Sequence, residues 1–135
     1  MPIWCNTYPT HLISLFRLQK KILRIITKSN FFDHTHPLFK ETRIIKLFDL
    51  NKLQIAIYMY KDIHLNRNLN SQICHNYQTR TRNEIRIPQH NLTLFQHSMS
   101  YMGPKVWNSV PDHIKNLPSL PSFKKHYKLY MTSLY

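Results

Sequence analysis

The segment from Thr10 to Lys28 repeats its apolar residues at the spacing of an α-helix. Successive helical residues are about 100° apart, so residues three and four positions apart share a face. The apolar face of this segment comprises Leu12, Leu15, Phe16, Leu18, Ile22, Leu23, Ile25 and Ile26. Thr10 can cap the helix, and Ser29 and Asn30 can end it. The pattern predicts the first helix of a mainly α-helical fold.

Two further helical segments follow. Pro37 lies in "HTHPLFKE", where its missing N–H costs nothing in a first helical turn. We therefore expect a short helix there, with Thr35 or His36 as its cap. Asp49 can cap the next segment, "LNKLQIAIYMYKDIHL", which is apolar on most sides. A helix of that kind is usually buried, so we expect this one at the centre of the fold.

The rest of the chain changes character twice. Residues 66–83 are rich in Asn, Gln, Thr and Arg, which predicts a flexible polar and basic loop after a basic helical segment over 1–65. Residues 84–135 are expected to hold a small β-hairpin, short helices and a C-terminal helix. The alternation in Glu84–Ile87 predicts a strand that Pro88 stops, and 91–102 is its candidate antiparallel partner.

Gly103 is the only glycine of the chain, and Pro104 follows it. We expect this pair to turn strand-like chain sharply into helix, because glycine lowers the steric cost of such a turn. Residues 105–110 predict one helical turn, and Pro111 starts another. Ser119 and Pro121 then open the C-terminal amphipathic helix. Its apolar stripe comprises Phe123, Tyr127, Tyr130, Met131 and Leu134.

Charge is the strongest functional signal. Nineteen Lys and Arg face six Asp and Glu, which gives a formal net charge of +13. A field of this size favours polyanions such as RNA and DNA. The first helix places five cations opposite its apolar face, namely Arg17, Lys20, Lys21, Arg24 and Lys28. An ordinary solvated helix mixes both signs of charge, so this face is a candidate for phosphate contacts. The alternative is that these cations only solvate the helix.

Two other sets of side chains complete the candidate nucleic-acid-binding residues. Tyr77, Arg80 and Arg82 lie in the polar loop, where a tyrosine can stack on a base and arginines can bind the backbone. The last helix contributes Lys124, Lys125 and Lys128.

The sequence offers little catalytic chemistry. No two of the six acids are adjacent, whereas a two-metal nuclease or polymerase needs carboxylates that hold ions about 4 Å apart. A single glycine excludes a P-loop, a dinucleotide fingerprint and a nucleophile elbow. The pairs Cys74–His75 and His34–His36 are candidate metal ligands, but they lack the paired spacing of zinc sites. We expect no enzyme activity, no cofactor and no small-molecule substrate, and leave metal binding at these pairs open.

The longest apolar run, Ile55–Tyr60, is far shorter than the ~20 residues that span a bilayer. The N-terminal residues lack the basic start, apolar middle and cleavage site of a signal peptide. Two cysteines make at most one bridge. We therefore expect an intracellular, reduced protein of the nucleus or cytoplasm, with no membrane partner.

Several segments resemble, in order, parts of one known family. They are Trp4–Leu12, "LQKKILRIIT", "HTHPLFKE", "FDLNKLQIAIYMYK", "CHNYQTRTRN" and "GPKVWNSVPDHIKNLPSLPSFKKHYKLY". The series resembles the C-terminal region of reverse transcriptase polyproteins from non-long-terminal-repeat (LINE-like, jockey-like) retrotransposons, downstream of the polymerase core. The resemblance covers nearly the whole chain, and its most specific parts are the runs "LQKK-LRIIT" and "GPKVWNSVP".

The resemblance implies a parent enzyme that copies RNA into DNA at a nicked target. The family's metal-binding aspartates lie in a Tyr/Phe-x-Asp-Asp motif upstream of the matched region, so no catalytic residue carries over. The chain is then a non-catalytic C-terminal fragment that helps the parent polymerase domain to hold RNA or DNA. Separation from that domain would leave the apolar face of the first helix without a partner, and the fold incomplete.

Two alternatives remain open. One is a stand-alone nucleic-acid-binding module that a host has co-opted. The other is a protein-interaction piece whose exposed Leu and Ile face binds an acidic, apolar partner.

Overall fold

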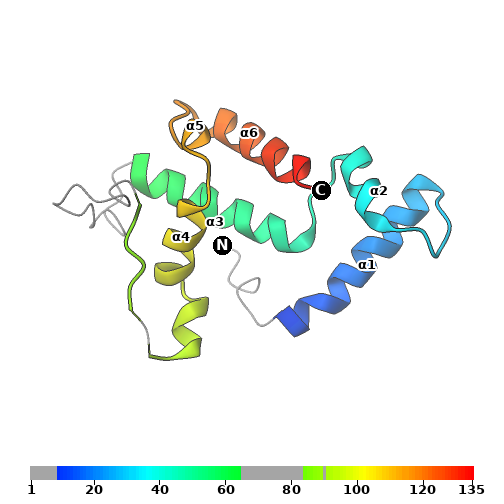
Figure 1. Ribbon diagram of the computed structural model, residues 1–135, viewed down its shortest axis with the longest axis horizontal. Helices are drawn as coiled ribbons and strands as arrows, with labels where there is room; N and C mark the ends of the chain where they lie inside the picture. The colour runs from blue at the N-terminus through cyan, green and yellow to red at the C-terminus, as the bar shows by residue number, and fades with distance from the viewer. Residues whose placement is uncertain (1–8, 65–83, 90) are drawn as a thin grey trace.

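The computed structural model describes residues 9–64, 84–89 and 91–135, and these are mainly α-helical (Figure 1). The helices are α1 (Pro9–Thr27), α2 (Thr35–Thr42), α3 (Leu47–His64), α4 (Met99–Asn108), α5 (Asp112–Lys115) and α6 (Leu120–Ser133), with a 3₁₀-helix, η2 (Thr93–His97), before α4. The four helices expected over residues 10–28, 35–41, 50–65 and 120–134 are thus confirmed as α1, α2, α3 and α6. Asp49 is not a cap, because α3 begins two residues earlier.

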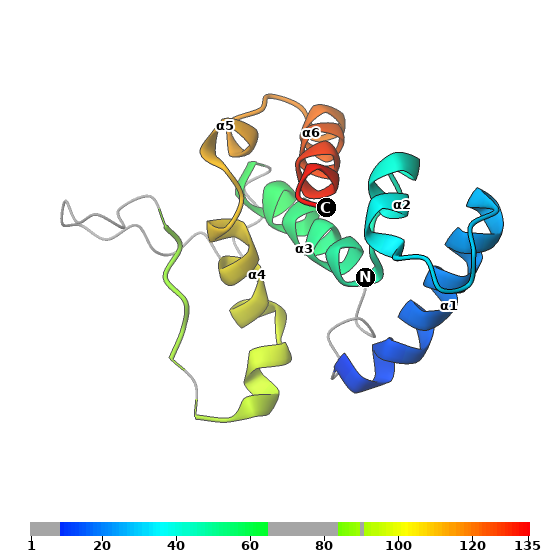
Figure 2. The same cartoon turned by 45° about the vertical axis from the view of Figure 1, so that its right-hand side comes forward.

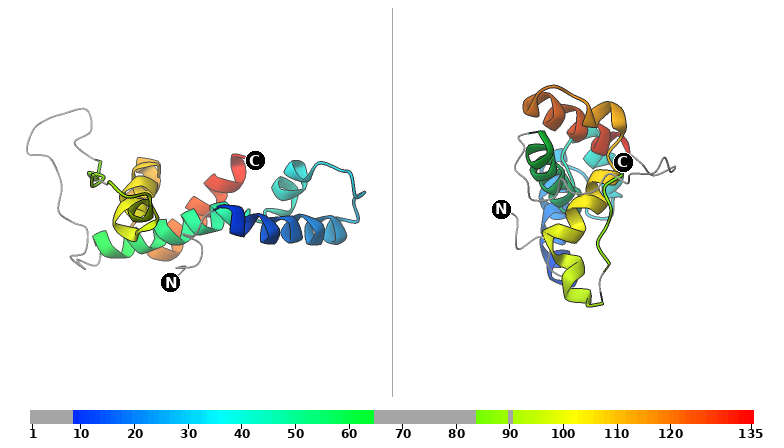
Figure 3. Two further views of the ribbon diagram at one scale, coloured as in Figure 1. Left: turned by 90° about the horizontal axis from the view of Figure 1, so that it is seen from below. Right: turned by 90° about the vertical axis from the view of Figure 1, so that its left-hand side faces the viewer.

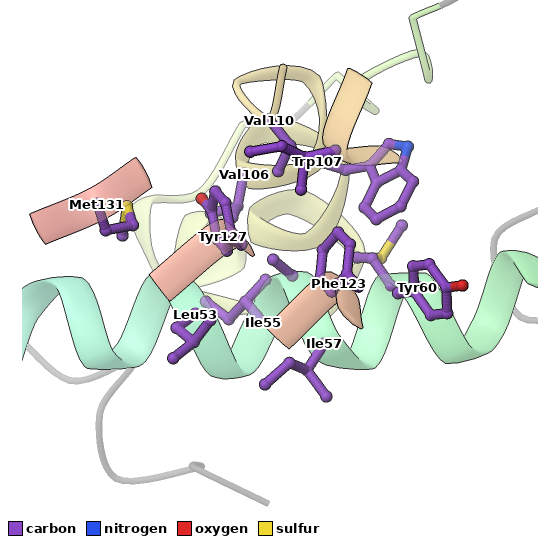
Figure 4. Close-up of a cluster of buried hydrophobic side chains, with 13 residues drawn as sticks. Leu53, Ile55, Ile57, Tyr60, Val106, Trp107, Val110, Phe123, Tyr127 and Met131 are labelled. Carbon is purple, nitrogen blue, oxygen red and sulfur yellow. The ribbon is translucent and has the colours of Figure 1, made fainter. Parts of the chain in front are cut away.

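Helix α3 is the central helix, as its apolar sequence predicts. It packs against α4 and α6 over much of its length and against α1 near its start. The core that it shares with α4, α5 and α6 comprises Leu53, Ile55, Ala56, Ile57, Met59, Tyr60, Val106, Trp107, Val110, Ile114, Phe123, Tyr127 and Met131 (Figure 4). The Phe123 ring lies 4.6 Å from Tyr60 and 6.0 Å from Trp107, centroid to centroid. One fully buried ring therefore joins α3, α4 and α6.

Helices α1 and α2 lie at one end of an elongated molecule (Figure 3). Of residues 10–27, only Leu12 and Leu23 are buried. The half-buried Phe16 ring packs 6.2 Å from Phe39 and 5.3 Å from Phe48. The broad apolar face expected for α1 is therefore divided into a buried part and a part that faces solvent. Its exposed part, called here the apolar stripe, comprises Leu15, Leu18, Ile22, Ile25 and Ile26, which are 46%, 52%, 55%, 75% and 60% exposed.

The expected β-hairpin is wrong. Residues 84–89 form no strand, and the segment expected to pair with them forms η2 and the first turns of α4. The backbone N–H of Ile85 donates to Asn108 Oδ1 at 3.0 Å, and Asn108 Nδ2 donates to the Ile85 carbonyl at 2.9 Å. A buried backbone needs partners for both groups. The side-chain amide at the end of α4 provides the two bonds that a neighbouring strand would have made.

Gly103 also has a different role from the one expected. It lies inside α4, and its φ is not positive. A Cβ at this position would lie 2.6 Å from Met59 Sδ on α3. The glycine therefore permits a close approach of two helices. Pro104 continues the same helix and is buried beside it.

Tyr135 connects the end of α6 to the start of α3. Its hydroxyl donates to Asp49 Oδ2 at 2.9 Å and accepts from the Lys46 backbone N–H at 3.0 Å. Lys46 Nζ lies 3.7 Å from the centroid of the same ring. Burial raises the pKa of the Tyr135 hydroxyl to about 12. The hydrogen bond from the Lys46 N–H opposes this rise in pKa, whereas the Asp49 carboxylate increases it. Burial also raises the pKa of Tyr127 to about 12.

We expect Gly103→Ala to lower the free energy of unfolding by about 1–3 kcal/mol, the usual cost of overpacking a core. The sign is informative, because alanine in an unconstrained helix interior is favoured over glycine by about 1 kcal/mol. Urea denaturation monitored by circular dichroism measures the change. A gain in stability would mean that Met59 moves aside and that the close approach is not required.

We expect Tyr135→Phe to destabilise the fold at neutral pH by about 1–2 kcal/mol, because it removes a hydrogen bond to a charged acceptor and leaves the Lys46 N–H without its partner. Between pH 10 and about 12 the wild-type tyrosine stays protonated when folded and ionises when unfolded. Stability therefore falls with rising pH in that window. Thermal melts from pH 9 to 12 should show a shallower fall for the variant. An equal slope would contradict the assignment.

Candidate nucleic-acid interface

Helix α1 carries different chemistry on three sides. One side packs against α2 and α3, and a second exposes the apolar stripe. At about 100° per residue, the third side gathers Arg17, Lys20, Lys21, Arg24 and Lys28, as expected from the sequence. This third side is called the basic face below.

The cations of the basic face differ in their freedom. Arg17, Lys21 and Lys28 are exposed. Lys20 is half-buried, and its Nζ lies 4.5 Å from the centroid of the Phe16 ring. Arg24 is also half-buried, and its Nε and Nη2 donate to the Asp33 carbonyl at 3.3 and 3.0 Å.

Acidic residues do not balance this face. Among the described residues, ion pairs join Lys52 to Asp49 and Lys115 to Asp112, and none involves α1. The Asp33 carboxylate on the loop after α1 accepts instead from the Asn30 backbone N–H at 2.8 Å. Arg17, Lys21 and Lys28 are therefore the cations of this face that are most available to an external anion.

The end of α1 turns the chain back toward the basic face. Lys28 has φ 51°, the Ser29 N–H donates to the Arg24 carbonyl at 3.0 Å, and the Lys28 N–H donates to the Ile25 carbonyl at 3.3 Å. This pair of bonds is a Schellman motif, which usually places glycine at the left-handed position. A lysine there adopts a conformation that is unfavourable for a residue with a Cβ.

The returning loop borders an open pocket of about 450 Å³. The pocket is lined by Lys21, Arg24, Ile25, Lys28, Ser29 and Phe31. The Phe31 ring centroid lies 5.7 Å from Arg24 Cζ. Within the loop, the Asp33 N–H donates to the Asn30 carbonyl at 3.1 Å. Three cations and one aromatic ring thus line one site at the C-terminal end of α1.

The other candidate residues are not part of this site. Helix α6 packs mainly against α3, α5 and α2, and α2 lies between α6 and α1 (Figure 2). The α6 cations Lys124, Lys125 and Lys128 are exposed there, apart from the basic face. Tyr77, Arg80 and Arg82 lie outside the described residues, as do Cys74 and His75.

Candidate metal ligands are dispersed in the part of the chain that the structure describes, where no three His, Cys, Asp or Glu residues come close enough to hold an ion. His34 precedes α2, and His36 Nδ1 lies 3.4 Å from Lys46 Nζ. Asp62 is buried in α3, and neither of its carboxylate oxygens has a hydrogen-bond partner among these residues. None of the described helices is both long enough and apolar enough to cross a membrane.

Two residues that position the site were missed by the sequence analysis. Gln19 Nε2 donates to the Ile45 carbonyl at 2.8 Å, and the Leu47 N–H donates to Gln19 Oε1 at 3.0 Å. This amide fixes α1 against the link between α2 and α3. Phe31 is the aromatic residue of the pocket. The only signal for it in the sequence is the pair "FF" beside turn-forming Asn30 and Asp33.

Comparison of the chain with models of protein families, with curated proteins and with solved structures finds no match. The function is therefore argued from the basic face of α1 and from the pocket at its end.

Proposed function

We propose that this protein binds the phosphate backbone of RNA or DNA through the basic face of α1 and that it performs no catalysis itself. The observation that carries the proposal is the open pocket, where Lys21, Arg24 and Lys28 meet and form no ion pair with an acid of the described residues. Phosphate contacts of this kind supply most of the affinity of non-specific nucleic-acid binding.

Solvation of the helix explains the basic face poorly. Arg17 and Lys21, and Lys20 and Arg24, are like-charged pairs at i,i+4 within α1. Each such pair destabilises a helix by about 0.2–0.5 kcal/mol, so together they cost about 0.4–1 kcal/mol. The helix dipole offsets this cost only for cations in the last turn. A bound polyanion would remove the repulsion along the whole face.

We further propose the setting that the sequence resemblance implies, a C-terminal region of a LINE-type reverse transcriptase inside the cell, with the parent polymerase domain as partner. The motif "GPKVWN" supports a non-catalytic role for this region, because most of its residues have packing roles. Gly103, Pro104, Val106 and Trp107 are buried, and Asn108 holds Ile85. A stand-alone, co-opted module would bind through the same face. Joining the chain to an upstream polymerase domain and assaying polymerisation distinguishes the two.

Lys28→Gly tests the proposed site, and Arg43→Gly is its matched control. Both residues have left-handed backbones, with φ 51° and 54°, so glycine relieves strain at either position while removing one charge. Only Lys28 lines the pocket. We expect Lys28→Gly to weaken binding to an RNA or DNA oligonucleotide several-fold and to reduce the salt slope by about one. Arg43→Gly should change both much less, and both variants should melt no lower than wild type.

Equal losses in the two variants would show that only net charge matters and that the pocket is no site. Arg17→Glu with Lys21→Glu extends the test to exposed cations that make no structural contact. The same reversal at Lys124, Lys125 and Lys128 measures what α6 contributes.

A second candidate function is favoured by the apolar stripe. Its exposed residues lie beside the basic face, and Ile25 lines the pocket together with Lys21. Charge complementarity favours an acidic amphipathic helix as the occupant. A second copy of this chain would bring two basic faces together and be repelled.

We expect Leu18→Ser with Ile22→Ser to abolish binding of a designed Glu- and Leu-rich helical peptide while leaving the melting temperature nearly unchanged, because both residues are about half exposed. Fluorescence anisotropy with the labelled peptide measures binding, in the presence of nuclease. Failure of the wild type to bind the peptide would contradict this candidate. Self-association of the wild type in sedimentation, lost in the variant, would contradict it in favour of a second copy.

A further inference from the structure

The pocket at the end of α1 contains an aromatic ring that phosphate binding alone does not use. We propose that it holds one unpaired nucleotide of a single-stranded nucleic acid, with the base stacked on Phe31 and the flanking phosphates near Lys21 and Lys28. This inference rests on the proposed function and extends it by specifying single strands.

Phe31 and its neighbour Phe32 are the most exposed phenylalanines in the described part of the chain. Phe31 is 68% exposed and lines the pocket, whereas Phe39 and Phe123 are completely buried. Full burial of a phenylalanine is among the larger apolar contributions to the stability of a fold. The fold forgoes most of that stabilisation here, although the ring lines a concave site. A face-on ligand such as a nucleobase would cover the ring.

The backbone on both sides of Phe31 is fixed before any ligand binds. Arg24 donates two hydrogen bonds to the Asp33 carbonyl, and Asn30 and Asp33 bond to each other in both directions. These bonds lie on both sides of Phe31 and fix the backbone that carries its ring. A ring on a fixed backbone loses less conformational entropy on binding than one on a flexible loop, so stacking on it would add to affinity.

Size and charge also fit one nucleotide. The volume of about 450 Å³ lies in the usual range for small-ligand sites, about 300–1,000 Å³. Lys21 lies on α1 and Lys28 on the turn that follows it, and both exposed side chains can reach phosphates on either side of the base. The Asp33 carboxylate is engaged by the Asn30 N–H. Lys21 and Lys28 are exposed and open to phosphates, whereas Arg24 is bonded to the Asp33 carbonyl.

Stacking on Phe31 would discriminate between strands. In a duplex the faces of the bases are covered by their neighbours, so a side chain outside the helix reaches only edges and backbone. A single strand exposes these faces, and stacking on an aromatic side chain then contributes whatever the base. The cations serve both forms equally, because both present phosphates.

The test compares three ligands of equal length at one salt concentration: a single-stranded oligothymidine, the same strand with abasic sites, and a duplex. We expect the wild type to bind the intact strand about tenfold more tightly than the abasic one. Phe31→Leu should reduce this ratio to near one while leaving duplex affinity and the salt slope unchanged. Phe31→Trp should keep the ratio. Phe32→Leu is the matched control, because Phe32 is 91% exposed and does not line the pocket.

The outcomes separate the two proposals. An equal affinity of the wild type for intact and abasic strands, or an unchanged ratio in Phe31→Leu, would overturn base stacking and leave phosphate binding standing. A loss of the ratio in Phe32→Leu but not in Phe31→Leu would move the stacking residue out of the pocket and overturn the inference. Failure to bind any of the three ligands at low salt would overturn the proposed function itself. Circular dichroism melts establish that each variant is folded.

Discussion

The close approach of α4 to α3 at Gly103 determines the arrangement of the C-terminal half of this protein. Because no Cβ separates Met59 from the α4 backbone, Val106 and Trp107 reach the buried face of α3 one turn later. The same placement brings Asn108 to the backbone of Ile85 and directs the chain through α5 into α6. Phe123 then completes the aromatic contacts to Tyr60 and Trp107. One missing methyl group thus supports contacts among three helices, which accounts for a glycine in a chain that otherwise has none.

The N-terminal half is joined to this core by polar anchors as well as by aromatic contacts such as Phe16 on Phe48. Gln19 bonds to the backbone on either side of Lys46, and Tyr135 bonds to the Lys46 N–H and to Asp49. Both anchors act on the short link between α2 and α3. Side-chain amides also satisfy the backbone at Ile85, so the described chain twice uses an Asn or Gln where another fold would use a strand. These few anchors attach α1 to the rest of the fold through one narrow side and leave its other two sides exposed.

Helical periodicity is a local property, and it predicts α1, α3 and α6 because their hydrogen bonds lie within each segment. It also places the cations of α1 on one face correctly. The prediction of a hairpin was wrong for the opposite reason. The alternation at Glu84–Ile87 fits any extended segment that is hydrogen-bonded on one side. The residue that bonds Ile85 is Asn108, which is 23 positions away in the sequence.

The pocket could not be predicted either. Phe31 reaches it only because Lys28 adopts a left-handed backbone and Arg24 binds the Asp33 carbonyl. Periodicity also could not divide the apolar face of α1, because which half is buried depends on α2 and α3.

The division of α1 has an energetic consequence that links its two open sides. Residues 10–27 bury two leucines, whereas α3 buries six apolar residues and packs against α1, α4 and α6. The small number of buried apolar residues places α1 at the low end of local stability, since local opening costs least where few apolar groups are buried. The repulsion within the basic face lowers it further. A ligand that binds only the folded helix stabilises it in proportion to the logarithm of ligand concentration over the dissociation constant. Occupation of the basic face would therefore order the apolar stripe as well, because both belong to the same nineteen-residue helix. The two candidate functions of α1 are for this reason thermodynamically coupled, and each occupant would raise the affinity for the other.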